Sequence, residues 1–124
     1  MIFFDLFRRE PDLLEVAAGA FVFKEGESED FMYVVVSGSA NVMIGDRVVE
    51  NCTVGTVLGE TAMIGNDSRC TSVVALTNCE IARIDRKRFH FLISQTPSFA
   101  TEVMKIMARR LRNADGMLRE QGGN

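Results

Sequence analysis

One stretch near the middle of the chain decides its fold: Gly59-Glu60-Thr61-Ala62-Met63-Ile64-Gly65-Asn66-Asp67-Ser68-Arg69-Cys70-Thr71. Its first two residues open a helical turn expected over residues 61–64, a polar loop follows, and Arg69 closes the loop before a strand-like run. Backbone N–H groups at the start of a helix attract anions, and a guanidinium fork matches two phosphate oxygens. The carboxylate of Glu60 repels an anion but accepts hydrogen bonds from a neighbouring sugar hydroxyl. The stretch therefore predicts a cradle for a phosphate and a ribose.

The same residue types also fit a purely structural role. A glutamate at the start of a helix can pair with a loop arginine, and such ion pairs on protein surfaces contribute little to stability. The chemistry of these residues alone leaves both interpretations open.

Helices are expected at both ends of the chain. Residues 1–17 predict a helical lead-in, and residues 85–120 predict two C-terminal helices, because their apolar positions recur with helical spacing. Asp85 is placed to cap the first of these helices, and Pro97 is placed to open the second, longer one.

Between these ends, residues 18–84 predict a series of short strands. The strand-like runs follow one another at roughly 8–12-residue intervals with turn residues between them, which is typical of a sandwich or barrel. Residues 31–36 are apolar on both faces, so this strand is expected inside the domain. Gly45 and Asp46 predict a two-residue type II′ loop in a hairpin. The whole chain is therefore expected to form one mainly β domain.

Residues 59–71 resemble the phosphate-binding cassette of cyclic-nucleotide-binding domains, found in catabolite activator proteins, kinase regulatory subunits and cyclic-nucleotide-gated channels. That pattern is Gly-Glu-Leu-Ala, a loop of variable length, and Arg followed by Ala, Ser or Thr. Two positions depart from it: Thr61 replaces an apolar residue, and Cys70 replaces the Ala, Ser or Thr. The matching residues are Gly59, Glu60, Ala62 and Arg69.

Three further motifs carry the resemblance beyond the cassette, over about residues 18–112. They are a turn, a strand and a strand-to-helix junction: Phe23-Lys24-Glu25-Gly26-Glu27, Tyr33-Val34-Val35-Val36-Ser37-Gly38, and Ile84-Asp85 with Phe89, Leu92 and Ile93. The resemblance implies a single domain over residues 1–124: a jelly-roll β-roll with a short N-terminal helical segment, one short cassette helix and two C-terminal helices.

The resemblance also implies a ligand site in the cassette, for cAMP or cGMP. Arg69 would bind the phosphate, and Glu60 would accept the ribose 2′-hydroxyl. The backbone amides of Thr61 and Ala62 would face the phosphate. In cGMP-selective relatives a threonine usually follows the arginine, so Cys70 favours a modest preference for cAMP. The site residues expected on this basis are Gly59, Glu60, Thr61, Ala62, Arg69, Cys70 and Thr71.

The last predicted helix carries two features that remain open. Its apolar residues fit either the seam of a homodimer or a face packed on the β-roll: Met104, Met107, Leu111, Ala114 and Leu118. Its basic residues fit either a solvated face or, as in related channels, a cap over the purine, for which the candidates are Arg109, Arg110 and Arg112.

The residue types present exclude most catalytic centres. The chain holds one histidine, His90, whereas a cupin-type iron or zinc site needs about three histidines, or two with a carboxylate. The same scarcity argues against Ser-His-Asp and Cys-His arrangements. Residues 59–65 lack the Lys-Ser/Thr ending of a phosphate-binding P-loop. No catalytic residue, metal or cofactor is predicted.

Charge and composition limit the classes of partner and the cellular location that we expect for the chain. Residues 1–60 hold 11 acids and 4 bases, whereas residues 61–124 hold 6 acids and 10 bases, which argues against a broad basic face for nucleic acid. The three cysteines have no paired spacing and suit a reducing compartment, so a cytoplasmic location is expected. The N-terminus has no long apolar run, which argues against membrane insertion.

These observations predict a non-catalytic sensor of cyclic nucleotide that acts through its C-terminal helix on an unknown effector protein. The alternative is a domain of the same fold that serves as a protein-interaction scaffold without binding nucleotide. Thr61 and Cys70 favour the scaffold, whereas Glu60 and Arg69 favour the sensor.

Overall fold

The computed structural model describes residues 2–65 and 68–122, with side chains through residue 113. Its contacts divide the chain into two compact units, Met1–Phe89 and His90–Asn124. Asn66 and Asp67 of the cassette lie outside the described residues.

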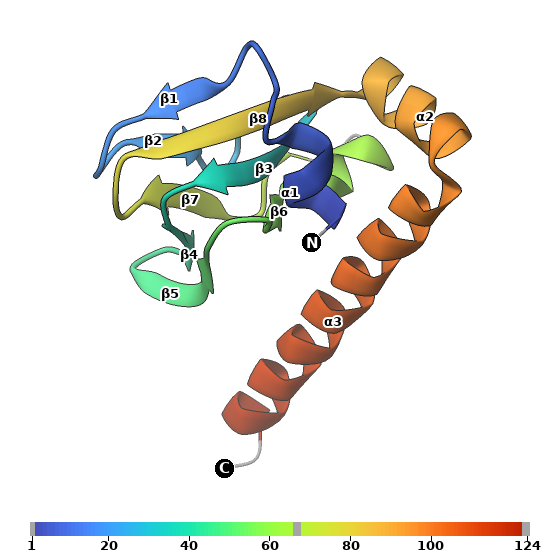
Figure 1. Cartoon of the computed structure of the whole chain (residues 1–124). Helices are drawn as coiled ribbons and strands as arrows, with labels where there is room; N and C mark the ends of the chain where they lie inside the picture. Colours follow the sequence, from blue (N-terminus) through green and yellow to red (C-terminus); the bar gives the residue numbers. More distant parts are fainter. Residues whose placement is uncertain (1, 66–67, 123–124) are drawn as a thin grey trace. The chain divides into compact units, whose positions relative to one another are not determined.

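The first unit is built from two antiparallel four-stranded sheets (Figure 1). This is the mainly β, jelly-roll arrangement that the sequence predicts. In sheet order, the first contains β1 (Leu14–Val16), β8 (Cys79–Asp85), β3 (Phe31–Ser37) and β6 (Val57–Leu58). The second contains β2 (Phe21–Phe23), β7 (Ser72–Ala75), β4 (Ala40–Ile44) and β5 (Arg47–Cys52).

Strand β3 is buried on both faces, as its apolar sequence predicts. On one face, Tyr33 and Val35 join the core cluster shared by the two sheets. On the other face, Met32 and Val34 are fully buried. The N-terminal helix packs against β3 and buries Phe3 and Phe7.

The predicted hairpin and helix ends are confirmed. Strands β4 and β5 pair from Ala40 to Ile44, and Gly45 has a φ of 57°, which is the left-handed value that a type II′ loop requires at its first position. The Oδ1 of Asp85 accepts the N–H of Arg88 at 2.8 Å, so Asp85 caps the helix that follows. The helices are α1 (Ile2–Phe7), the 3₁₀ turn η1 (Glu60–Met63), α2 (Arg86–Gln95) and α3 (Pro97–Gly122).

The predicted helical lead-in over residues 1–17 is wrong at its C-terminal end. Helix α1 stops at Phe7, and residues 14–16 form strand β1 against β8. Leu14 and Val16 pack against the core cluster while Glu15 between them is exposed, which is the alternation of a half-buried strand. The β-roll therefore begins at residue 14 and not at residue 18.

Helix α3 of the second unit has an apolar face and several exposed apolar residues. Phe99, Val103 and Ile106 are buried at helical spacing, whereas Met104 and Leu111 of the predicted seam are exposed. Ala114 and Leu118 of that seam lie outside the described side chains. Within the described part of the chain, no helix combines the length and the apolar character needed to cross a membrane.

Candidate functional site

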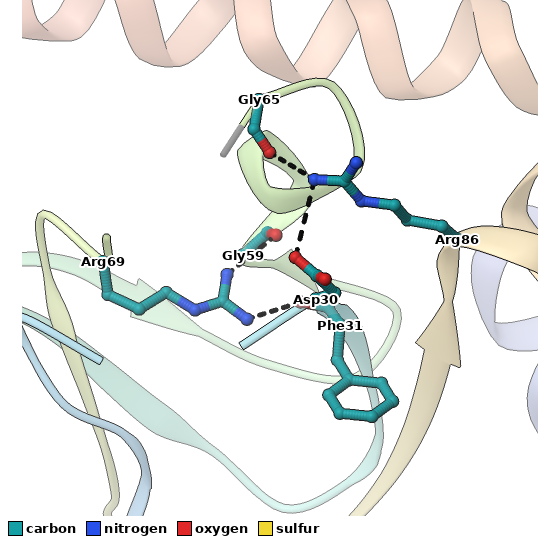
Figure 2. Close-up of polar contacts among 6 residues, drawn as sticks. All are labelled: Asp30, Phe31, Gly59, Gly65, Arg69 and Arg86. Carbon is teal, nitrogen blue, oxygen red and sulfur yellow. Dashed lines mark hydrogen bonds and ion pairs between the residues drawn. The ribbon is translucent and has the colours of Figure 1, made fainter. Parts of the chain in front are cut away.

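Arg69 lies at the centre of the candidate site. Its side chain is buried, and its two terminal nitrogens bind backbone carbonyls from different segments (Figure 2). Nη1 donates to the carbonyl of Gly59 at 2.9 Å, and Nη2 donates to the carbonyl of Phe31 at 2.5 Å. The guanidinium therefore ties the start of the cassette to the start of β3.

Two aromatic rings form the floor under this guanidinium. Its Cζ lies 4.3 Å from the ring centroid of Phe23 and 5.8 Å from that of Tyr33, and the two rings stack at 5.8 Å. Burial, with help from a hydrogen bond to Glu29, raises the pKa of Tyr33 to about 12. A phenol is neutral at physiological pH even at its ordinary pKa of 10.0, so Tyr33 does not cancel the charge of Arg69.

The charge of Arg69 has no acidic partner among the described residues. Its guanidinium contacts two neutral carbonyls and two rings, and its Nε–H is buried without an acceptor in the described part of the chain. An isolated buried cation is costly unless an anion or further acceptors reach it. The arrangement is therefore one that an anionic ligand would stabilise.

The turn after β2 fixes the backbone of Arg69. The N–H of Arg69 donates to the carbonyl of Glu27 at 2.8 Å, and the N–H of Gly26 donates to the carbonyl of Arg69 at 2.9 Å. The Phe23–Glu27 motif thus supplies both an aromatic floor and a backbone clamp. This role could not be predicted from the motif alone, since its partner Arg69 is distant in sequence.

Gly59 is required by the geometry around Arg69. Its φ of 69° is left-handed, and a Cβ at this position would lie 2.4 Å from Nη1 of Arg69. Both the backbone conformation and the close approach of the guanidinium exclude a side chain.

The cassette helix is a four-residue 3₁₀ turn, Glu60–Met63, so it is shorter than a regular helix and begins one residue earlier than predicted. Glu60 is buried and Thr61 is exposed. The N–H of Ala62 donates to the carbonyl of Gly59 at 3.2 Å. The turn thus engages this amide in the structure, and its expected role toward a phosphate stays a prediction.

The remaining candidates differ in exposure. Cys70 is exposed, with its Sγ 3.9 Å from the carbonyl of Ser68, and Thr71 is half-buried. The proposed purine-cap residues lie on α3, in the second unit, where Arg109 and Arg112 are exposed and Arg110 is half-buried. Their role stays a prediction.

A second arginine contacts the same region and was missed by the sequence analysis. Nη2 of Arg86 donates to the carbonyl of Gly65 at 2.5 Å and lies 3.5 Å from Oδ1 of Asp30 (Figure 2). The available signal was its place directly after Asp85, in the strand-to-helix junction.

Two surface hollows of the first unit have other linings. One, of about 260 Å³, is lined by three carboxylates and two guanidiniums, together with Phe31. The other, of about 560 Å³, lies along Glu15, Ser37 and Glu80. Neither is lined by Glu60 or Arg69. Among the described residues, no group of three or more His, Cys, Asp or Glu side chains is placed to hold a metal ion.

Comparison with known proteins identifies the family. The model of the cyclic nucleotide-binding domain matches residues 13–96. The chain belongs to this family. This confirms the resemblance drawn from the cassette and the flanking motifs.

Known members of the family include kinases and regulators. The chain is 29% identical over 82 residues to cGMP-dependent protein kinase 2 of Mus musculus, an alignment covering 66% of this chain and 11% of the kinase. It is 30% identical over 78 residues to the cAMP-dependent protein kinase regulatory subunit of Eremothecium gossypii, covering 63% of this chain and 17% of that subunit. The catabolite activator protein of Thermus thermophilus superimposes with a TM-score of 0.81 at 26% identity, covering 95% of this chain and 58% of that chain. The cyclic-nucleotide-binding domain thus spans only part of each relative.

Proposed function

We propose that this cyclic-nucleotide-binding domain is a non-catalytic sensor that binds cAMP or cGMP and acts on an effector protein. The observation that carries the proposal is the buried guanidinium of Arg69, which has aromatic rings beneath it and no acidic partner among the described residues. A cyclic phosphate would supply the missing negative charge through charge-assisted hydrogen bonds.

The hydrogen-bonding capacity of Arg69 supports this role. A guanidinium has five N–H groups, and two of them serve the carbonyls of Gly59 and Phe31. The others can turn to a phosphate while the carbonyl contacts hold the side chain in place. Arg69 is thus positioned before the ligand arrives, which lowers the entropic cost of binding.

Glu60 would recognise the sugar of the same ligand. It directly follows Gly59, whose carbonyl binds Arg69, so its carboxylate belongs to the segment that the guanidinium holds. A buried carboxylate is a strong acceptor for a ribose 2′-hydroxyl. A phosphate site beside a hydroxyl acceptor suits a cyclic nucleotide better than a free phosphate.

The choice of purine and the output are the finer parts of the proposal. The relatives are named for both cAMP and cGMP, and the exposed Cys70 favours cAMP. Ligand binding would alter the position or order of the C-terminal helices, with an arginine of α3 covering the purine and an effector or a second copy of the chain responding. Three free cysteines suit a cytoplasmic setting.

One observation favours the scaffold alternative. Both terminal nitrogens of Arg69 already have protein acceptors, so this residue could serve only to tie the cassette to β3. A scaffold of this kind would keep its fold without responding to nucleotide.

Calorimetric titration separates the two functions. The parent chain is titrated with cAMP, cGMP and, as a control, the non-cyclic 5′-AMP; we expect binding of at least one cyclic nucleotide and weaker binding of 5′-AMP. The Arg69→Ala variant should lose roughly 2–5 kcal/mol of binding free energy. Absence of binding by the parent would favour the scaffold.

A further inference from the structure

Phe31 contacts two different guanidinium groups, one through its backbone and one through its ring. Its carbonyl accepts a hydrogen bond from Nη2 of Arg69 at 2.5 Å, and the Cζ of Arg83 lies 4.6 Å from the centroid of its ring. Figure 2 shows the ring of Phe31 pointing away from Arg69. One residue therefore connects Arg83 to the arginine at the centre of the candidate site.

The register of the first sheet brings Arg83 to this ring. Arg83 of β8 is paired with Tyr33 of β3, and Asp85 is paired with Phe31. Residues that are paired directly in an antiparallel sheet point to the same face, and alternate residues of one strand share a face as well. Arg83 and Phe31 are therefore diagonal neighbours on one face, within the reach of a long side chain and an aromatic ring.

The ring of Phe31 is restricted from two directions. Phe31 is the first residue of β3, is half-buried, and packs against the core cluster. Arg83 is exposed and lies over the ring, without an ion pair to a carboxylate in the part of the chain that the structure describes. Both the core cluster and the guanidinium thus hold this ring in place.

The carboxylates nearest to Arg83 are engaged elsewhere or lie beyond ion-pair distance. Arg83 lines the smaller surface hollow together with Glu10, Asp12 and Asp85. Glu10 binds the guanidinium of Arg88, and Oδ1 of Asp85 accepts the backbone N–H of Arg88. The contact with Phe31 is therefore the interaction that orients Arg83.

Arg69 and Arg83 also act on a common group. Burial, with help from Glu29, raises the pKa of Tyr33 to about 12, and the positive charges of both arginines oppose this shift. The charge of Arg83 is therefore close enough to act on an anion directly, as well as through Phe31. An experiment must separate these two effects.

We propose that Arg83 is a positioning residue for the ligand site: by holding the ring of Phe31, it holds the carbonyl that orients Arg69. The carbonyl and the ring belong to one residue at the start of a strand, so a ring that moves turns the carbonyl with it. The proposal rests on the proposed function, since it concerns the same site. Arg83 is not proposed to touch the ligand.

The first measurement is affinity for cAMP and cGMP by calorimetric titration. Arg83→Gln should weaken affinity about two- to fivefold, which is what an exposed cation–π contact supplies. Arg83→Lys should restore part of the loss, because an ammonium can also lie over the ring. The matched control is Arg47→Gln, which removes the same charge from an exposed strand position of the other sheet and should bind like the parent.

A second background separates positioning from direct electrostatics and from general destabilisation. Arg69→Lys keeps the charge, but an ammonium lacks the planar fork that reaches the carbonyls of Gly59 and Phe31 together. If Arg83 acts through the Phe31 carbonyl, Arg83→Gln should cause no further loss of affinity in this background. A direct effect of its charge, or a loss of structure, would persist there with the same fold-change.

A third measurement needs no ligand. The Nε–H of Arg69 is buried, so its exchange with solvent can be followed by NMR in the free protein. Arg83→Gln should speed this exchange, because the guanidinium of Arg69 is held less firmly, and Arg47→Gln should leave it as in the parent. Circular dichroism and chemical denaturation check that each variant is folded, and Arg83→Lys keeps the comparison decisive if the glutamine variant is not.

The outcomes separate the positioning role from the proposed function. If the parent binds cyclic nucleotide and Arg83→Gln binds equally tightly, or loses the same factor when residue 69 is lysine, the positioning role is overturned and the sensor stands. Unchanged exchange of the Arg69 Nε–H in Arg83→Gln overturns it as well. A parent that binds no cyclic nucleotide overturns the sensor, and with it any role of Arg83 at a ligand site, before a variant is compared.

Discussion

Two arginines of the first unit, Arg69 and Arg88, lie over aromatic rings, but only Arg88 has a charged acceptor. The Cζ of Arg88 lies 5.3 Å from the ring centroid of Phe7, and its guanidinium forks onto the carboxylate of Glu10, with Nη2 2.7 Å from Oε1 and Nη1 on Oε2. This contact lowers the pKa of Glu10. The Cζ of Arg69 lies 4.3 Å from the ring centroid of Phe23, and its terminal nitrogens donate to neutral carbonyls.

This difference in acceptors distinguishes an arginine whose charge is balanced within the fold from one whose charge is suited to an anionic ligand. Arg88 has a carboxylate in bidentate geometry, so its charge is already balanced within the chain. Arg69 also donates hydrogen bonds from both terminal nitrogens, but its acceptors carry no full charge. An anion would therefore gain far more from Arg69 than from Arg88.

The sharpest way to break this comparison is to remove each charge in turn. Arg69→Gln should weaken cyclic-nucleotide binding by roughly 2–5 kcal/mol, because a buried charge-assisted contact is lost. Arg88→Gln should leave affinity unchanged and lower the free energy of unfolding. Calorimetric titration and chemical denaturation of both variants check this. Equal loss of affinity in the two variants would show that Arg69 has no special relation to the ligand.

The next largest effect concerns the acceptor beside Arg69. A 2′-deoxy cyclic nucleotide should bind the parent more weakly by about 1–3 kcal/mol, because the buried carboxylate of Glu60 loses a donor. In Glu60→Gln the ribo and deoxy ligands should differ less. Competition titrations of the four combinations give the coupling between Glu60 and the hydroxyl. If the parent binds both ligands equally, Glu60 serves the fold alone.

Gly59 tests whether the position of the guanidinium matters as well as its charge. Gly59→Ala should lower the free energy of unfolding by about 1–2 kcal/mol, since the residue is left-handed. It should also weaken nucleotide binding, because the new Cβ displaces Arg69. The matched control is Gly19→Ala: Gly19 has a φ of 86°, and a Cβ there would meet nothing within 4 Å. Similar losses of affinity in both variants would contradict this role of Gly59.

Much of the fold could be predicted because its signals are local. The loop at Gly45, the cap at Asp85 and the helix start at Pro97 each depend on residues close in sequence, and the structure has all three. Strand β1 could not be predicted in this way. It is three residues long, and it is a strand because it pairs with β8, more than sixty residues further along the chain.

The residues of the candidate site can be divided in the same way, into those with a local sequence signal and those without one. Gly59, Glu60 and Arg69 form a recognisable motif, so they could be named from the sequence. The carbonyl of Phe31 carries no side-chain signature, and the ring of Phe23 reaches Arg69 only because the sheets bring them together. Arg86 was missed for the same reason, because its acceptor at Gly65 is a backbone atom.

The pair of Glu10 and Arg88 predicts a smaller, pH-dependent effect. The hydrogen bond from Arg88 holds the pKa of Glu10 below its ordinary value of 4.5, against the opposing effect of burial. A lowered pKa stabilises the fold above the unfolded value, and this contribution is lost as pH falls through the folded pKa. Between about pH 6 and about pH 3 the parent should lose roughly 1 kcal/mol more than Glu10→Gln, since solvent screens the partly exposed Arg88. Denaturation across this range checks it, and parallel curves for parent and variant would contradict it.

The smallest expected effect concerns Cys70. This residue follows Arg69, which is predicted to bind the phosphate, and is itself expected to influence which purine the site prefers. A thiol is a weak hydrogen-bonding group, whereas a threonine hydroxyl at this position can reach the guanine amino group. The neighbouring Thr71 is half-buried, whereas Cys70 is exposed. The hydroxyl of Thr71 is therefore not expected to take the place of a threonine hydroxyl at position 70. The parent should therefore prefer cAMP modestly, and Cys70→Thr should shift the ratio toward cGMP by about 1 kcal/mol or less. Cys70→Ala, which adds no hydroxyl, is the control in the same competition assay. The role assigned to Cys70 is wrong if the parent already prefers cGMP, or if threonine and alanine change the ratio alike.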